Sequence, residues 1–561
     1  MAAGSGVWVA AAPYAAASHR GGTLTKVTSL LPPVDPVHDY PLATVYDGLV
    51  AFRKAGGAQG ETLVPDLAVT LPRPANGGTT YTFTLRRGIR YSTGALVRAS
   101  DFRRGIQRAL GFGAVPSYYE GILGAPACHQ HPRRCDLSAG IVTNDAAGTV
   151  TFHLGRADPD FLDKLALLMA APAPPGAAGH PMDQAPFLPG TGPYMISQYV
   201  PNSPSALVAL VQNPRFHERY MVPDYGPTPS LTLVRNPYFR QWSYAAQPAG
   251  YPNVIRLVYM ADPGQEQSAV AAGRADLVNI SDEGLPYGPL DIRYPARLHS
   301  GLKLQTEYLF LNTRRPPFSS LKARQAINYA IDRGRIIRLL HFGVPGQATP
   351  TCQILPAGFP SYQRYCPYTA GAKDGAWHGP DLATAVRLAH QSGTTQVPVT
   401  MWTVKEVTNA GVNSYLVGLL KALGYRANLR TVPAVQFFAM PGKSIRKIQL
   451  GLMGWGADIP AASDFFLQVL TCRSYHDPGS FNFGGFCDPH ADQLASAAQA
   501  ALQADPAAAR KLWARVDRIV TGQAPWVPIY DRSSTMFVSA RVGNYQESPV
   551  YGPLLDQIWV R

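Results

Sequence analysis

The chain has 561 residues, of which 46% are hydrophobic and 15% are charged, and its formal net charge is +14. This length and apolar fraction exclude a disordered protein and a single small domain, because single cores rarely grow beyond about 250–300 residues. The positive charge would suit nucleic acid, anionic ligands or an acidic cell envelope. However, Lys and Arg are scattered and no RNP, zinc-finger or helix-turn-helix pattern accompanies them, so we interpret them as a solvated basic surface.

The N-terminal segment is apolar and alanine-rich and ends in small residues, as a secretion signal does, but it lacks a positive start. We therefore interpret residues 1–20 as a signal-like remnant or a linker. No cysteine precedes Cys128, so no lipoprotein anchor is visible in the sequence. The sequence contains no run of 18 apolar residues, so no membrane-spanning helix is predicted.

The first predicted elements alternate between strands and helices. Residues 23–28 predict a strand, and residues 41–50 predict a helix after a proline-broken loop. Aromatic and threonine side chains alternate in residues 80–85, which is typical of a half-buried strand. Ser100 is the expected N-cap of the next helix. A second alternating strand is predicted at residues 150–154.

The six cysteines form three couples that are close in sequence: Cys128 and Cys135, Cys352 and Cys366, and Cys472 and Cys487. An even number in local couples predicts disulfides and an oxidising compartment. His129 and His131 lie within the first couple, so a zinc site is the alternative there, although the spacing fits no common zinc module.

The central part of the chain predicts strands at residues 232–235 and 254–259. Residues 308–340 then contain a short apolar strand, a Pro316-Pro317 turn and an amphipathic helix. The helix is indicated by apolar residues that recur on one face at positions 323, 326, 327, 330 and 331.

The C-terminal part predicts a strand at residues 397–402, a helix at 408–423 and a strand at 426–432. Gly424 follows the helix at the position where a left-handed cap is favoured. The remaining predicted elements are a strand at residues 448–455 and a helix at residues 507–521. The whole pattern indicates a mixed α/β protein with several sheets.

Six separated segments resemble, in the same order, the peptide/nickel-binding family of extracellular solute-binding proteins of ABC importers, family 5. They are GGTL at 21–24, the segment YTFTLRRGIRYSTGALVRASDF at 81–102, GTGPY at 190–194, LVRNPYF at 233–239, the strand, turn and helix at 308–340, and GWGAD at 454–458. Each segment alone is weak evidence, but six in the same order are specific, and the resemblance extends from residue 21 to the C-terminus.

This resemblance implies a two-lobed, periplasmic-binding-protein-like α/β fold of type II, the large peptide-binding class. Lobe I would comprise residues 21–305, with an extra subdomain at about 51–180, and would be completed by residues 524–561. Lobe II would comprise residues 306–523. The hinge would lie where the chain crosses between lobes, near residues 305–308 and 523–528.

The resemblance also places a ligand-binding site at the end of the strand at 448–455, an edge where open α/β sheets bind ligands. Gly454 and Gly456 would let a ligand backbone approach, with Ala457 completing the segment, and Trp455 would supply flat apolar area. Asp458 matches the family aspartate that pairs with the α-ammonium of a bound peptide.

Other ligand contacts are expected from loops. Dipeptide-binding relatives carry an arginine after the strand that corresponds to residues 397–402. Here that loop is shorter and Lys405 is its only cation, which favours a longer peptide or a sugar-like solute over a dipeptide. Ser29 is expected to line the side of lobe I. Tyr46 and Trp402 are candidate walls, although aromatic residues of this kind more often belong to a core.

The implied function is that of a receptor of an ABC transporter, which captures an oligopeptide-like ligand between its lobes and delivers it to a permease. Binding of an oligosaccharide or a metal chelate by the same fold is the alternative. A hydrolase is disfavoured, because the sequence has no G-x-S-x-G and no H-E-x-x-H. The segment PGKS at 441–444 is similar to a phosphate loop, but Phe437 stands where its first glycine belongs.

The implied partners are a peptide or another small solute and the transmembrane subunits of the permease. No catalytic residue, metal, cofactor or nucleic acid is expected. The protein would act as a monomer outside the cytoplasm, in a secreted, surface-held or periplasmic form that is peripheral to the membrane.

Overall fold

The computed structural model describes residues 19–28, 40–111, 118–131, 134–175, 187–200, 229–260, 262–281, 290–340, 346–371, 373–405, 409–433, 437, 448–475 and 480–561. Three features of the sequence, the N-terminal segment 1–18, Ser29 and the segment 441–444, lie outside these residues. Within the described ranges, no helix has both the length and the apolar character needed to cross a membrane.

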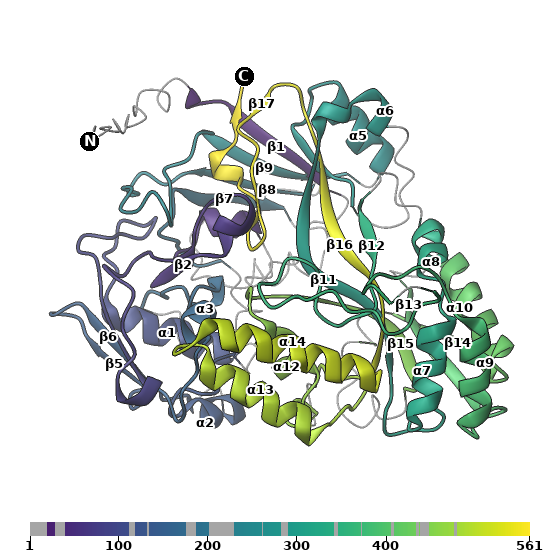
Figure 1. Cartoon of the computed structure of the whole chain (residues 1–561). Helices are drawn as coiled ribbons and strands as arrows, with labels where there is room; N and C mark the ends of the chain where they lie inside the picture. Colours follow the sequence, from purple (N-terminus) through teal and green to yellow (C-terminus); the bar gives the residue numbers. More distant parts are fainter. Residues whose placement is uncertain are drawn as a thin grey trace, which may run out of the picture.

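One large sheet runs through the molecule (Figure 1). Among the described residues it has eleven strands, in the order β14-β13-β15-β11-β16-β10-β1-β9-β8-β7, and β12 pairs with β16 beside this path. The strands are β1 (Thr23–Thr28), β7 (Tyr194–Val200), β8 (Ser230–Arg235), β9 (Val254–Tyr259), β10 (Leu277–Asn279), β11 (Leu298–Leu311), β12 (Ala348–Pro350), β13 (Pro398–Val404), β14 (Arg426–Val432), β15 (Leu450–Gly456) and β16 (Trp526–Val538).

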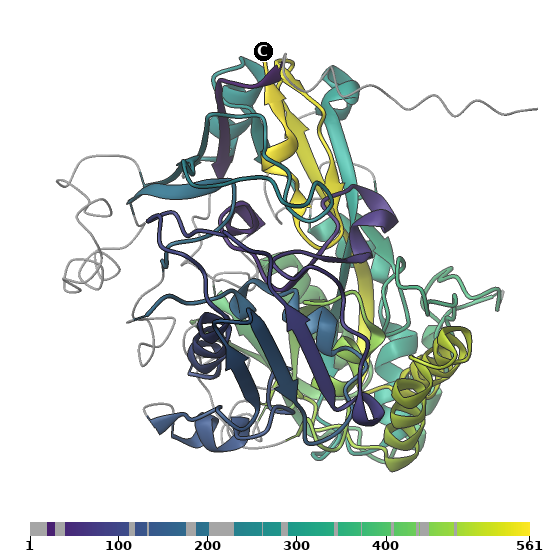
Figure 2. The same ribbon diagram turned by 90° about the vertical axis from the view of Figure 1, so that its left-hand side faces the viewer.

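The two ends of this sheet each contain a parallel group. Strand β1 is parallel to β9 and β10, and β13 is parallel to β14 and β15. The antiparallel pair β11 and β16 joins the two groups, and in Figures 1 and 2 these strands run from the upper body of the molecule to the lower body. The sheet is therefore shared by two α/β bodies that are connected by two long strands.

The pairing between β11 and β16 is interrupted in its middle. Its register shifts between Leu302 and Thr306 and again between Glu307 and Tyr308. Pro528 of β16 lies opposite Tyr308, at the second shift. Because proline has no N–H for a ladder bond, it is tolerated inside a strand mainly at such irregularities. The ladder that joins the two bodies is thus broken at a defined place.

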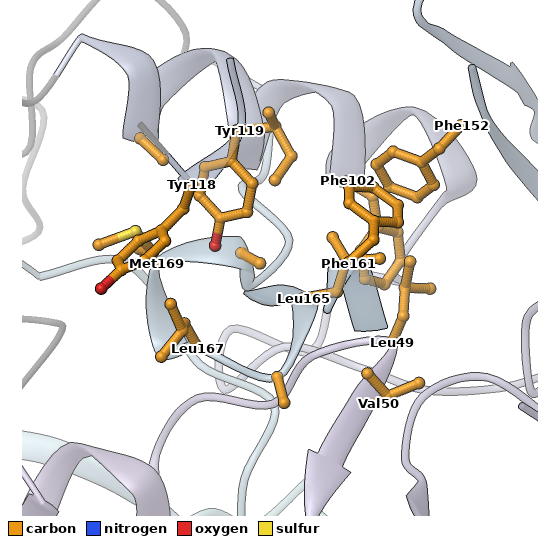
Figure 3. Close-up of a cluster of buried hydrophobic side chains, with 14 of the residues drawn as sticks. Leu49, Val50, Phe102, Tyr118, Tyr119, Phe152, Phe161, Leu165, Leu167 and Met169 are labelled. Carbon is orange, nitrogen blue, oxygen red and sulfur yellow. The ribbon is translucent and has the colours of Figure 1, made fainter. Parts of the chain in front are cut away.

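A small three-stranded sheet, in the order β4-β6-β5, forms a separate layer in the N-terminal half. Its segment lies in the chain between β1 and β7, which belong to the upper body, so we count this layer with the upper body. Its strands and the helices beside it are β4 (Thr80–Thr84), β5 (Ile141–Asn144), β6 (Thr149–His153), α1 (Ala99–Leu110), α2 (Ala125–Gln130) and α3 (Phe161–Leu165). Phe102 of α1, Phe152 of β6 and Phe161 of α3 meet in its core (Figure 3). This layer has its own hydrophobic core, distinct from the cores of the large sheet.

The lower part of the large sheet is covered on both faces. Tyr308 and Phe310 pack into the same core as α12 (Ala462–Val469), α13 (Pro489–Ala501) and α14 (Pro506–Gln523). Leu309 and Leu311, which alternate with them along β11, pack with α7 (Leu321–Ala330), α8 (Arg333–Leu339), α9 (Leu382–Gln391) and α10 (Ala410–Ala422). Successive side chains of a strand point to opposite faces, so β11 serves both cores.

The remaining described elements are short. They are β2 (Val50–Phe52), β3 (Leu63–Pro65), α5 (Pro263–Ala271), α6 (Leu290–Arg293), β17 (Val542–Gly543), β18 (Glu547–Ser548), β19 (Gly552–Pro553) and β20 (Trp559–Val560). Strands β2 and β3 pair with each other, as do β17 and β20 and also β18 and β19.

Two local predictions are wrong. Residues 41–50 do not form a helix: a 3₁₀ turn covers Tyr40–Thr44, and the chain then bends into β2. Gly48 lies in this bend, where a Cβ would meet a Leu165 carbonyl oxygen at 3.0 Å, so packing of the backbone overrides the helical pattern. Ser100 is the second residue of α1 and bonds to Asp145 rather than capping the helix.

Candidate ligand-binding site

The predicted site lies at the end of β15, between β13 and β11 in the sheet. A Cβ on Gly454 would lie 2.5 Å from an oxygen of Glu307, so the absent side chain of this glycine makes room for the neighbouring strand. Gly456 is exposed, and a Cβ there would meet only Gln305, at 3.7 Å. The Glu307 carboxylate is 3.7 Å from the guanidinium of Arg532 on β16. The exposed backbone at this strand end therefore belongs to Gly456 rather than to Gly454.

The Asp458 side chain, two residues beyond β15, bonds to a residue from the other body of the molecule. The hydroxyl of the buried Tyr118, from the N-terminal layer, donates to the half-buried Asp458 carboxylate. The same hydroxyl oxygen lies 2.8 Å from Oδ1 of Asp464, in the first turn of α12. The Asp458 amide donates to Oδ2 of Asp464 at 3.2 Å. One tyrosine thus bridges two aspartates of the lower body.

The proton count of this cluster defines its charge. A phenol has one proton, so Tyr118 cannot donate to Asp458 and Asp464 at the same time. Burial and then the nearby Asp458 raise the pKa of Asp464 well above its ordinary value. We infer that Asp464 carries a proton and donates it to the Tyr118 oxygen, while Tyr118 donates to Asp458. Burial, followed by both carboxylates, also raises the Tyr118 pKa well above its ordinary value, which keeps the phenol neutral.

A second polar contact joins the same two parts. Ser463 of α12 donates to the Asp160 carboxylate at 2.6 Å, and Gln499 of α13 donates to the same oxygen. Burial raises the pKa of Asp160 above its ordinary value, and the nearby Lys164 offsets only part of this rise. Ile459, just after Asp458, packs into the core of the N-terminal layer. The lower body therefore contacts that layer through residues 458–464 and also through Gln499 of α13.

The predicted aromatic residues differ in their surroundings. Trp455 is half-buried, and its ring lies 5.6 Å from that of Phe481, which is exposed. Trp402 is buried in the core on the face of α12–α14, and the guanidinium of Arg430 lies 4.3 Å from its ring. Tyr46 lies in the N-terminal half, where its hydroxyl donates to the Leu188 carbonyl oxygen at 3.0 Å.

The other predicted residues are placed by the sheet. Lys405 is exposed and directly follows β13, which is parallel to β15, so the two strands end on the same edge. Ala457 is half-buried and its amide donates to the Leu304 carbonyl oxygen at 2.8 Å. The structure thus brings the 454–458 segment and the end of β13 to one edge, while Tyr46 lies in the other body.

Sequence reasoning missed Tyr118, Asp160 and Asp464, which form the polar contacts between the two bodies. Asp464 carries a recognisable signal, because acidic side chains are favoured in the first turn of a helix. Tyr118 and Asp160 carry none. Their role depends on tertiary packing between segments that are more than 300 positions apart in the chain.

The three predicted disulfides are confirmed. Cys128 is bonded to Cys135, Cys352 to Cys366, and Cys472 to Cys487. No cysteine in the described part of the chain is free.

The fold and this junction define a two-lobed binding protein, in which the large sheet and its two crossing strands join the lobes. A family model described as bacterial extracellular solute-binding proteins, family 5 Middle, matches residues 62–477. The chain belongs to this family. The family and the two-lobed α/β fold predicted from the sequence are both confirmed.

Individual relatives are distant. The chain is 27% identical to probable di/tripeptide-binding protein 5 of Pseudomonas aeruginosa, over 54% of this chain and 56% of that protein. The match therefore spans about half the length of that relative. It is 24% identical to heme-binding protein A of Haemophilus influenzae, over 90% of this chain and 85% of that protein. The solved structure of clavulanic acid biosynthesis oligopeptide binding protein 2 has a TM-score of 0.78 at 22% identity, covering 97% of this chain and 96% of that one.

Proposed function

We propose that this chain is the solute-binding receptor of an ABC importer and that it captures oligopeptide-like ligands between its lobes. Family membership supports the receptor role. The names of the Pseudomonas relative and of the solved structure specify peptides. The main structural support for a peptide ligand is the position of Asp458. Its carboxylate lies at the end of β15 and contacts Tyr118 of the opposite lobe.

Asp458 is assigned to the α-ammonium group of the peptide. An ammonium group has three N–H donors and requires acceptors, which a half-buried carboxylate supplies. In a site from which water is largely excluded, this charged hydrogen bond contributes roughly 1.5–3 kcal/mol. Tyr118 already donates to the Asp458 carboxylate, so the ligand would share this carboxylate with the phenol or displace it.

The remaining contacts are assigned from their places in the fold. Trp455 supplies apolar area beside Asp458, and the exposed Gly456 allows a ligand backbone to approach. Lys405 stands on the same sheet edge and is the cation proposed for the carboxylate end of the ligand. Gly454, Ala457, Ser29, Trp402 and Tyr46 are kept as further lining residues. Of the two predicted walls, Tyr46 remains half-buried whereas Trp402 is held in a core.

We propose the lobe division 21–305, 306–523 and 524–561, with the subdomain at about 51–180. The hinge is assigned to the middle of β11 and β16, because their register is irregular between residues 302 and 308. A ladder with missing bonds bends at lower cost than a regular one, and each lobe keeps its own core.

A metal chelate is the second candidate ligand, because the chain is similar to heme-binding protein A along 90% of its length. A flat chelate would use the apolar Trp455 and Phe481 rather than Asp458. The two candidates therefore require different residues.

The partners and location follow from the receptor role. We propose that the protein delivers its ligand to the transmembrane subunits of a permease, acts as a monomer outside the cytoplasm, and releases the ligand chemically unchanged.

The test combines ligand identification with one substitution. Native mass spectrometry of the extracted protein should reveal a mixture of peptides. By calorimetry, the Asp458→Asn variant should bind free peptides about tenfold or more weakly. N-acetylated peptides should lose clearly less affinity, because for them only the weakened bond from Tyr118 changes. Asp291→Asn, on α6 at the far end of the molecule (Figure 1), is the matched control. Recovery of heme alone, or an equal loss for free and acetylated peptides, would refute the assignment.

A further inference from the structure

A pocket of about 380 Å³ lies at the lower end of the molecule, between the turn after β11, the end of α14 and the start of α13. Its volume is within the range of small-molecule sites in proteins. Its lining includes Thr313, Arg314, Ser319, Arg324, Asp488 and Gln523.

Arg324 is a buried cation whose partners are all uncharged. Only 6% of this residue is exposed. Its Nε donates to the Gln523 carbonyl oxygen at 2.9 Å, and its Nη1 donates to the Phe318 carbonyl oxygen at 2.8 Å and to the Ser319 carbonyl oxygen at 3.4 Å. Within the described residues, no carboxylate forms an ion pair with it and no acceptor bonds to its Nη2. Burial lowers its pKa to about 10, so the side chain stays charged at neutral pH.

Arg314 places a second guanidinium in the same pocket. Its Nε donates to the Gly485 carbonyl oxygen at 2.7 Å, and its guanidinium carbon lies 4.3 Å from the centre of the Tyr475 ring. These two contacts hold the side chain in one orientation. As for Arg324, no ion pair to a carboxylate is present in the part of the chain that the structure describes. Among the described residues, the two oriented guanidinium groups of this pocket therefore form no ion pair with a carboxylate.

Among the described lining residues, Asp488 is the one carboxylate, and it has a structural task. One of its oxygens accepts the amides of His490 and Ala491 and caps α13. The described lining residues therefore carry two positive charges against one negative charge, and Ser319 is among them. Guanidinium groups favour oxyanions, which they bind through paired hydrogen bonds.

This pocket is separate from the proposed peptide site. Strands β11 and β15 are antiparallel, with Leu311 opposite Leu450 and Gln305 opposite Gly456. Asp458 follows the Gly456 end of β15, whereas Thr313 and Arg314 follow the Leu311 end of β11. At about 3.3 Å per residue, the two places are about 20 Å apart along the sheet.

We propose that the pocket formed by Arg314 and Arg324 binds a small oxyanion, a carboxylate or a phosphate group. Arg324 forms the positively charged floor, and Arg314 closes over the anion from the more exposed side. The occupant is either a free anion from solution or an acidic side chain of a partner protein. Both would use the same two guanidinium groups.

The test titrates the full chain with sodium phosphate and, separately, with sodium acetate, at an ionic strength held constant with sodium chloride. Saturable binding by calorimetry, with a rise in the melting temperature, is expected for at least one anion. Arg314→Gln should weaken it about tenfold or more, because a charged hydrogen-bond partner is lost. Arg315→Gln is the matched control, because it removes the same charge from an exposed neighbour outside the lining.

Two further variants keep the result interpretable. Arg314→Lys keeps the charge without the planar fork and should retain part of the affinity, even if Arg314→Gln disturbs the bond to Gly485. Asp458→Asn should bind the anion normally, which separates this site from the peptide site. Binding of acetate as well as phosphate would favour an acidic side chain as the natural occupant, and binding of phosphate alone a free phosphate. The proposal would be overturned if phosphate and acetate changed the melting temperature no more than chloride does. It would also be overturned if Arg314→Gln and Arg315→Gln lost anion affinity equally.

Discussion

The hydroxyl of Tyr118 gives the sharpest test of how the two lobes are held together. Tyr118→Phe removes one oxygen and keeps the ring in its apolar surroundings. It removes one hydrogen bond to Asp458 and one between Tyr118 and Asp464. Both carboxyl groups belong to the lower body, so the loss falls on the contact between lobes rather than on the interior of either lobe.

The expected magnitude follows from the two bonds. A hydrogen bond to a charged group contributes roughly 1.5–3 kcal/mol, and an unsatisfied buried group costs a similar amount. If closure loses only the bond to Asp458, the closed form becomes about tenfold to a hundredfold less populated relative to the open form. Because ligand is captured by the closed form, peptide affinity should fall by a similar factor.

Two measurements check this, with a control from the adjacent residue. Small-angle scattering of the ligand-free protein should give a larger radius of gyration for Tyr118→Phe, and calorimetry should give weaker peptide binding. Tyr119→Phe makes the same change one position along, where the hydroxyl donates to the Lys164 carbonyl oxygen at 2.9 Å within the N-terminal layer. If the two variants scatter identically and bind peptide equally well, Tyr118 does not hold the lobes together.

Two further predictions concern stability. Burial raises the Asp531 pKa from 3.8 to about 8, so folding binds a proton between these pH values. The free energy of unfolding should therefore fall as pH rises from about 4 through 8. The Asp531→Asn variant resembles the neutral acid and should flatten this pH dependence in urea titrations. An unchanged slope would contradict this origin. Replacing both Cys352 and Cys366 by alanine should lower the free energy of unfolding by about 2–4 kcal/mol, because this bond closes a short loop in the unfolded chain. A wild-type protein that unfolds at the same urea concentration with and without reductant would argue against that bond.

The sequence predicted elements well wherever local pattern and final packing agree. Strands β9 and β14 have the predicted bounds, and the helix expected at 408–423 is α10. Gly424 has a φ of +91°, as a left-handed cap requires. In β4, Tyr81 and Phe83 are buried, while Thr82 and Thr84, which alternate with them, are exposed, which reproduces the predicted alternation.

The long connecting strands were largely missed. Only the last four residues of the 14-residue β11 were predicted, and β16 was not recognised as a strand. The first part of β11 mixes polar and apolar residues, because it lies between bodies rather than in one core. Pro528 argues against a central strand unless the register shift beside it is known. Such features follow from the pairing of distant segments and have no local signature.

The position of Asp458 was predicted from the resemblance, whereas its partner could not be. A sequence pattern identifies a carboxylate at a strand end, but the choice of Tyr118 depends on how the lobes meet. Two of the contacts across this junction are polar, Tyr118 with Asp464 and Ser463 with Asp160, and this affects the cost of opening the lobes. Opening the lobes would return Asp464 and Asp160 to water, where both would ionise and be solvated, so separation costs less than exposing an equal apolar area. A receptor must release its ligand as well as capture it, and titratable groups at this junction lower the cost of opening it.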